Sequence, residues 1–160
     1  MIPVVLDCKN FDAVVAGSPE LVARNRHLLV AFDAAAVETI ELGFRLPSDY
    51  SAGSNVTGTL TIFAASATTG AVRCRVAFER VQAGAHDIDS DGFATAVDAT
   101  SATADATSGE SFTCSFTLSN ANLDGAAAGD FVRVQISRVG TDGADTMTGD
   151  AQFLDLVLTQ

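Results

Sequence analysis

The feature of this sequence that most limits its fold is a strict alternation of apolar and polar residues in short runs. The two runs nearest the C-terminus show it clearly, with apolar residues at Val132, Val134 and Ile136 and at Leu154, Leu156 and Leu158. A period of two places such side chains on one face of an extended strand, whereas a helix needs a period of about 3.6 residues. We therefore expect each run to form a β-strand with one apolar and one polar face.

Similar runs recur along most of the chain. We expect further strands at residues 2–6, 11–16, 28–32, 37–46, 56–65, 72–79, 93–100 and 112–118. Turn-forming residues separate these runs, which is typical of sandwiches and jelly rolls. The sequence thus predicts an all-β protein, an antiparallel β-sandwich of the jelly-roll type with about eight substantial strands and little helix.

The first 26 residues have the weakest strand pattern, and two interpretations of them stay open. Residues 18–20 carry helix start signals, so we expect one helical turn that ends by Arg24. Residues 1–26 form either an N-terminal arm that contacts a neighbouring molecule or ordinary edge strands of the sandwich. The length fits one domain, and we assign residues 27–160 to a single jelly-roll domain.

The apolar positions of the central runs predict the core. They are Ile40, Leu42, Phe44, Leu46, Val72, Cys74, Val76, Phe78, Phe112, Cys114, Phe116 and Leu118. Free cysteines commonly behave as small apolar core residues, and we interpret Cys74 and Cys114 in this way. A disulfide between them would require that their strands face each other, and no secretory signal supports it.

The formal net charge of -11 limits the partners. A nucleic-acid-binding protein must present Lys and Arg to phosphates, so the charge argues against nucleic acid and against an anionic membrane surface. Residues 81–130 contain eight acidic and no basic residues, which makes them either a negative surface for a partner or solvated loops. No apolar run of about 18 residues suggests a membrane span. We expect a chain that folds in a cytoplasm.

Residues for catalysis are few. A general base is conceivable at His27 or His86, but no nucleophile motif, metal-binding pair or phosphate loop accompanies them. The sequence therefore predicts a protein that is not an enzyme and has no cofactor. The chain has no Trp and one Tyr, Tyr50, and its Phe residues fall mostly on inward stripes. A carbohydrate site would then depend on polar contacts alone.

One acidic segment resembles the start of a calcium loop. Asp87, Asp89 and Asp91 alternate and are followed by a glycine, and Asp98 falls at the twelfth position of such a loop. The twelfth ligand is normally a Glu, and the flanking segments have no helical pattern. We therefore assign no metal. These acids form either a solvated acidic turn, which we favour, or a calcium site.

Three segments together resemble a known family. Residues 44–50 read FRLPSDY, residues 129–138 read GDFVRVQISR and residues 144–151 read ADTMTGDA. In this order they are similar to jelly-roll decoration (cement) proteins of tailed-phage capsids and to related head domains of tail fibres. The resemblance carries no catalytic residues.

The resemblance implies a structural virion protein. It would bind the outer surface of an icosahedral phage head as a homotrimer, contact the major capsid protein and stabilise the junctions between capsomers, after synthesis in the host cytoplasm. The alternative is a tail-fibre or receptor-binding head domain that recognises a glycan on the host surface.

Overall fold

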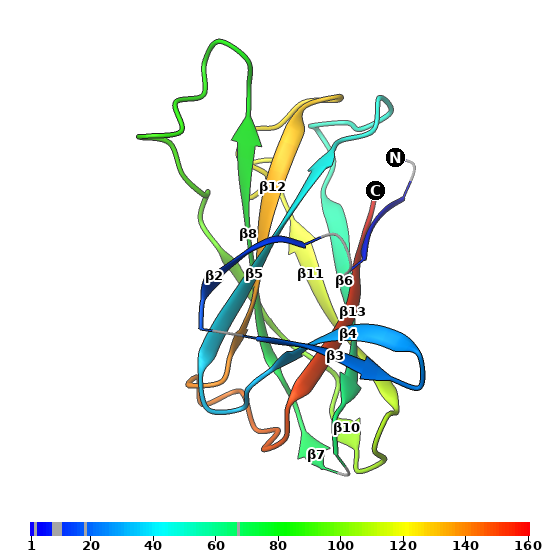
Figure 1. The fold of residues 1–160 in the computed structure, drawn as a ribbon. Coiled ribbons are helices and arrows are strands. Elements are labelled where there is room, and N and C mark those ends of the chain that lie inside the picture. Colours follow the sequence, from blue (N-terminus) through cyan, green and yellow to red (C-terminus); the bar gives the residue numbers. More distant parts are fainter. Residues whose placement is uncertain (2, 8–10, 18, 67) are drawn as a thin grey trace.

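The computed structural model describes residues 1, 3–7, 11–17, 19–66 and 68–160. They form an antiparallel β-sandwich with the predicted jelly-roll architecture, and the described part contains thirteen strands and no helix (Figure 1). Among the described residues no helix is long and apolar enough to cross a membrane. The prediction of the fold class is confirmed.

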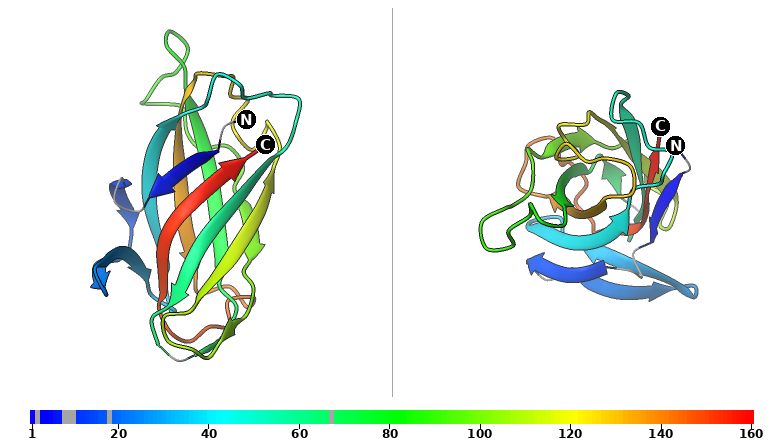
Figure 2. Two further views of the ribbon diagram at one scale, coloured as in Figure 1. Left: turned by 90° about the vertical axis from the view of Figure 1, so that its right-hand side faces the viewer. Right: turned by 90° about the horizontal axis from the view of Figure 1, so that it is seen from above.

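The larger sheet, sheet A, has six strands. Along its main path the strands are β11 (Ser111–Leu118), β6 (Val56–Ala64), β13 (Ala151–Thr159), β4 (His27–Phe32) and β3 (Glu20–Arg24). The sixth strand, β1 (Val4–Asp7), also pairs with β13, so the first and last strands of the chain are neighbours. The two termini lie together at one end of the sandwich (Figure 2).

The opposing sheet, sheet B, has five strands. Their order is β2 (Phe11–Ala16), β5 (Val37–Arg45), β12 (Phe131–Val139), β8 (Arg73–Val81) and β9 (Val97–Thr100). Two short strands, β7 (Thr69–Gly70) and β10 (Ala104–Asp105), pair at the far end of the molecule (Figure 1). Strand β9 is shorter than predicted, because residues 93–96 belong to a long loop after β8.

The core lies between the two sheets, where the predicted stripes meet. Cys74 and Phe78 of β8 and the preceding Val72 are 0% exposed, and the inward residues of β5, β11 and β12 are buried as well. Each buried Val, Leu or Phe side chain contributes roughly 1.5–3 kcal/mol to folding. The period-two pattern therefore identified most of the core correctly.

The pattern was wrong at one point of β13. Leu154 was expected to share a face with Leu156 and Leu158, but it is partly exposed and Phe153 is buried instead. The pairing of β13 with β6 shifts between Phe153 and Asp155, which is a β-bulge. The extra residue reverses the in-and-out order of side chains before the bulge relative to those after it.

The helical turn expected before Arg24 was also wrong. Residues 20–24 form β3, which pairs with β4 in a hairpin. Asn25 and Arg26 connect the strands with φ angles of 45° and 70°. Positive φ at both central residues is characteristic of the tight turns that join antiparallel strands, and it overrides the weak helix start signal.

The N-terminal strands all pair within the chain. Strand β1 pairs with β13, β2 with β5 and β3 with β4. The division of the chain into residues 1–26 and 27–160 remains a prediction.

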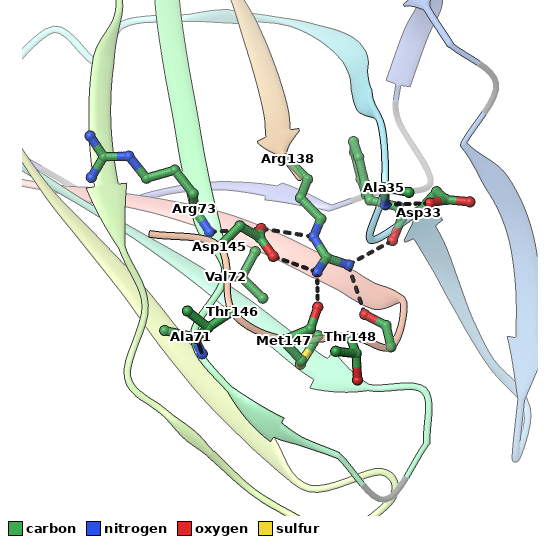
Figure 3. Close-up of polar contacts among 12 residues, drawn as sticks. Asp33, Ala35, Ala71, Val72, Arg73, Arg138, Asp145, Thr146, Met147 and Thr148 are labelled. Carbon is green, nitrogen blue, oxygen red and sulfur yellow. Dashed lines mark hydrogen bonds and ion pairs between the residues drawn. The ribbon is translucent and has the colours of Figure 1, made fainter. Parts of the chain in front are cut away.

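A buried ion pair fixes the loop between β12 and β13. The Arg138 side chain is 0% exposed and donates to both carboxylate oxygens of Asp145, at 2.9 and 2.7 Å. It also donates to the carbonyls of Phe32, Met147 and Gly149. Figure 3 shows the guanidinium enclosed by these groups. Such a pair is costly to bury unless every donor is satisfied, which is the case here.

Candidate functional site

A large hollow at the surface lies at the end of sheet B. It has a volume of about 500 Å³, and a second hollow of about 230 Å³ adjoins it and shares Gln82 and His86. We call the two together the loop cleft. The charged and aromatic side chains that also line it are those of Arg45, Arg80, Asp91, Asp124, Asp130 and Phe131. The loops that form it project from one end of the sandwich (Figure 1).

Three strand ends bring the walls of the loop cleft together. In the register of sheet B, Phe131 at the start of β12 is opposite Arg45 at the end of β5 and Val81 at the end of β8. The chain leaves β8 into the loop of residues 82–96 and enters β12 from the loop of residues 119–130. The antiparallel arrangement thus places both loops at the same end of the sheet.

Arg45 and Phe131 form a stacked pair in the larger hollow. The guanidinium carbon lies 5.9 Å from the centre of the Phe131 ring, and Nη1 donates to the Gly129 carbonyl at 3.2 Å. Phe131 is half-buried and Arg45 is exposed. The pair presents a planar surface with hydrogen-bond donors at its edge, in the part of the cleft open to solvent.

Asp124 and Asp130 are bound to the backbone and to Arg80. The Arg80 guanidinium donates to Asp130 at 2.5 Å, and its backbone N–H donates to Asp124 at 3.0 Å. Asp130 also accepts a bond from the backbone N–H of Ala127 at 2.8 Å. These bonds hold both carboxylates at the wall of the cleft, where their remaining lone pairs can accept from a ligand.

His86 joins the long loop to sheet B. Its Nε2 lies 3.7 Å from a carboxylate oxygen of Glu79, and its Nδ1 lies 3.4 Å from one of Asp91. The side chain is only 9% exposed. The structure therefore places this predicted candidate in the cleft. His27, the other candidate, is an exposed residue at the start of β4 in the hairpin with β3, and it does not line the cleft.

The acids of the calcium-loop pattern are engaged in a turn of their own. Asp91 accepts from the backbone N–H of Asp87 at 2.7 Å, and Asp87 accepts from the N–H of Asp89 at 3.0 Å. Asp98 lies in β9, where Arg75 donates to both its oxygens at 2.6 and 2.9 Å and holds the pKa of Asp98 below its usual value. No cluster of three or more metal-ligating side chains occurs among the described residues. The assignment of no metal, with these acids as no more than a candidate calcium site, remains a prediction without a test.

A partly buried polar cluster below the loop was not predicted. Arg133 donates to Glu79 at 2.7 Å and to Glu41, and Gln135 donates to Glu41 at 2.8 Å. The Phe93 ring lies over this guanidinium, 5.2 Å away. The hydrogen bond with Glu41 raises the pKa of Arg133. The cluster fastens residues 82–96 to the outer face of sheet B.

Phe131 was missed as a site residue for a simple reason. Most Phe residues were expected to face inward, so any sugar site was expected to depend on polar contacts alone. Phe131 occupies the other parity of β12 from Val132 and Val134, so it points away from the core. The alternation of residues in β12 therefore already indicated that Phe131 faces outward.

Comparisons with known proteins identify the fold. No family model matches the chain, and no curated protein matches it in sequence. Solved structures do match over nearly the whole chain. One is the CBM36-1 domain of a multidomain xylanase from the hindgut metagenome of Trinervitermes trinervoides, with a TM-score of 0.52, 11% identity, and 99% of this chain and 97% of that chain covered.

Two further solved structures are similar. A carbohydrate-binding module of family CBM36 in complex with calcium and xylotriose has a TM-score of 0.53 at 13% identity, with 98% and 99% of the two chains covered. The CBM35 module from Cellvibrio japonicus Abf62 has a TM-score of 0.50 at 12% identity, with 99% and 93% covered.

These matches correct the assignment to phage capsids. The solved structures that the chain resembles are carbohydrate-binding modules, so the predictions of a capsid decoration protein, of the major capsid protein as partner and of a homotrimer on a capsid are wrong. The segments behind that resemblance are local features. Residues 44–50 end β5 and turn, and residues 144–151 form the loop around Arg138. The chain has the jelly-roll fold of carbohydrate-binding modules.

Proposed function

We propose that this chain is a non-catalytic domain that binds a polysaccharide in the loop cleft. The observation that carries the proposal is the stacked Arg45–Phe131 pair, which lines the larger hollow of the cleft. Sugars combine apolar ring faces with hydroxyl groups at the rim, and they need both kinds of contact. The fold, shared with a module that was solved in complex with calcium and xylotriose, supports the same interpretation.

The groups around Phe131 match the hydroxyls of a sugar chain. Gln82 offers a donor and an acceptor, and Asp124 and Asp130 offer acceptors that neighbouring backbone groups already orient. A binding site with a few oriented polar groups beside an apolar surface is the usual design for small ligands. Oriented groups also lose little conformational freedom on binding.

The charges of the cleft favour a neutral polysaccharide. Three carboxylates, those of Asp91, Asp124 and Asp130, line it against two cations, Arg45 and Arg80, and Arg80 is already paired with Asp130. An anionic sugar chain would meet net repulsion there and in the field of a chain with a net charge of -11. We therefore choose xylan as the first probe, in agreement with the CBM36 complex.

The same contacts support binding without hydrolysis. Glycoside hydrolysis needs a pair of carboxyl groups facing the scissile bond, one as acid and one as base or nucleophile. In the cleft, Asp130 is bound by Arg80, and Asp91 is bound by its own turn and lies beside His86. Carboxylates held in this way are suited to accept hydrogen bonds from hydroxyls.

The experiment is a comparison of matched phenylalanine variants. Affinity electrophoresis and calorimetry with soluble xylan and with mixed-linkage β-glucan would compare wild type, Phe131→Ala and Phe63→Ala. Phe63 is also half-buried but lies on the outer face of sheet A, away from the cleft. We expect Phe131→Ala to weaken binding about tenfold or more, since loss of a stacked ring removes roughly 1.5 kcal/mol or more, and Phe63→Ala to bind normally.

Two results would contradict the proposal. One is the absence of retardation by every polysaccharide, and the other is equal binding by wild type and Phe131→Ala. A reducing-sugar assay on the same mixtures checks that no hydrolysis accompanies binding.

A further inference from the structure

A second hollow lies beside sheet A, at the tip of the β3–β4 hairpin. It has a volume of about 360 Å³ and is lined by the hairpin, by the end of β6, by the loop before β11 and by β13. We call it the hairpin hollow. It shares no residue with the loop cleft, and its volume is typical of a site for a small molecule.

The β-bulge of β13 shapes this hollow. Strand β4 pairs with β13 up to the Val30–Phe153 pair, and from Asp155 onwards β13 pairs with β1 instead. The hairpin therefore continues beyond the bulge without β13 as a neighbour. The same bulge turns Leu154 away from the core, and Leu154 lines the hollow. Bulges are common next to functional sites because they redirect a side chain in this way.

Three apolar side chains line the hairpin hollow. Leu29 is buried, whereas Phe63 and Leu154 are partly exposed. They come from three different strands of sheet A, so the fold brings together an aromatic ring and two branched aliphatic groups at one concave surface. Covering these groups removes apolar surface from water, which favours a ligand with an apolar body.

The charged group of the hairpin hollow is a cation. Arg24 donates through Nη1 to the carbonyl of Ala64 at 2.8 Å and to the side chain of Gln152 at 3.2 Å, and through Nη2 to the Ser108 hydroxyl at 2.7 Å. These neutral partners hold the guanidinium in place without cancelling its charge. Within the described part of the chain Arg24 has no ion pair, and its Nε–H has no acceptor. A fixed cation with a free donor is suited to a carboxylate.

No acid opposes this cation in the hollow. The other polar side chains there include Asn25 and His27, which are exposed. Glu110, next to the hollow in sequence, lines a different hollow together with Asp105. The loop cleft, in contrast, is lined by three carboxylates. The net charge of the chain opposes any anion at long range, but this effect is screened beyond about 8–10 Å in physiological salt, whereas a contact with the guanidinium is not.

We propose that the hairpin hollow binds a small aromatic carboxylate. The ring of the ligand covers Phe63 and Leu154, and its carboxylate accepts hydrogen bonds from Arg24. A sugar acid fits less well, because its hydroxyls would lose water against an apolar surface. The proposal goes beyond the binding of a polysaccharide and does not depend on it, since the two sites have no residue in common.

The first test uses the wild-type chain and NMR, which detects weak binding. Amide spectra would follow titrations with benzoate, with neutral benzamide of the same shape and with glucuronate, at constant ionic strength. We expect benzoate to shift the amide signals of residues 24–29, 63–65 and 108–109 in a saturable manner. Benzamide should bind about tenfold or more weakly, because it lacks the charge-assisted hydrogen bond. Equal binding of benzoate and benzamide, saturation by glucuronate alone, or no shift with any of the three would overturn the proposal.

Variants then assign the binding to the hollow. Arg24→Gln should weaken benzoate binding about tenfold or more, and Leu154→Trp, which fills part of the hollow, should abolish it. Arg26→Gln removes the same charge from the exposed turn outside the hollow and should bind as wild type does. Because Arg24 also fastens the hairpin to β6, circular dichroism would check the fold of Arg24→Gln. Leu154→Trp leaves Arg24 in place, and unchanged benzoate binding by this chain would contradict the proposal.

The two proposed sites can fail separately. Phe63→Ala should lose benzoate binding and keep xylan binding, because Phe63 lines the hairpin hollow and not the loop cleft. A wild-type chain that binds xylan and does not respond to benzoate would overturn this inference and leave the carbohydrate proposal intact. The opposite result would do the reverse.

Discussion

Arg138 illustrates how one side chain can fix a segment that the sequence pattern leaves undetermined. It lies in the alternating run of β12, where a charged residue is expected to face water, yet it is 0% exposed. Its partner Asp145 is 1% exposed, and Asp145 also accepts from the backbone N–H of Arg73 at 3.0 Å. The loop after β12 thus folds around a satisfied charge instead of an apolar anchor.

Removal of the Arg138 guanidinium should strongly destabilise the fold. We expect Arg138→Ala to lower the free energy of unfolding by about 3–5 kcal/mol, because it leaves the Asp145 carboxylate and three carbonyls without their donor inside the protein. Urea unfolding followed by fluorescence or circular dichroism would measure the change. Arg26→Ala, at an exposed turn, is the control and should change the stability by less than about 0.5 kcal/mol. A loss below about 1 kcal/mol at Arg138 would mean that water replaces the guanidinium.

At the scale of elements, the face of a strand on which each side chain lies was predictable, whereas the pairing of distant strands was not. The inward stripes of β8 and β11 follow from side chains that alternate along one strand, so sequence alone identified them. The bulge at Phe153 depends on which strand β13 pairs with, and a single run carries no such information. The tight turn at Asn25 lay within reach of sequence analysis, because two apolar runs flank it at hairpin spacing.

The anchoring of the long loop is the clearest case of what the sequence could not provide. Glu41, Glu79, Phe93 and Arg133 come from distant parts of the chain and meet on the outer face of sheet B. A charged residue on the outer face of a strand is predicted to be solvent-exposed unless the loop that covers it is known. For this reason the wall of the loop cleft could not be predicted, although several residues in it were identified individually.

Phe93 offers a test of this anchor. We expect Phe93→Ala to increase hydrogen exchange of the backbone amides in residues 82–96 and to weaken xylan binding by roughly three- to fivefold, because loss of the ring over Arg133 removes about 0.5–1 kcal/mol that holds the loop in place. Phe93 does not line the cleft, so an effect on binding would act through the loop.

Ile88→Ala is the matched control in the same loop. Its side chain is 78% exposed, so exchange and binding should stay near those of wild type. Equal exchange in Phe93→Ala and Ile88→Ala would show that the guanidinium–ring contact does not anchor the loop.

For the whole molecule, charge is distributed so that most cations are used within the fold. Arg73, Arg75, Arg80, Arg133 and Arg138 each form an ion pair with an acid. With 20 acidic residues in the chain, most carboxylates stay on the surface and repel one another. The protein should therefore tolerate salt, since screening weakens the repulsion at least as much as it weakens exposed pairs.

The Arg75–Asp98 ion pair joins β8 to β9, and its contribution to stability should depend on pH. Arg75 lowers the pKa of Asp98, so this carboxylate stabilises the fold above the ordinary Asp value of about 3.9 and loses its contribution as the pH falls through the lower folded value. We expect Asp98→Asn to be less stable than wild type at pH 7 by about 1 kcal/mol or less, because both side chains are partly exposed. The difference should shrink below pH ~4 and vanish near pH ~2. Asp89→Asn removes the same charge from an exposed turn and should follow wild type throughout. Thermal unfolding of the three chains across this pH range measures both differences, and a deficit for Asp98→Asn that persists at the lowest pH would assign the effect to packing and not to charge.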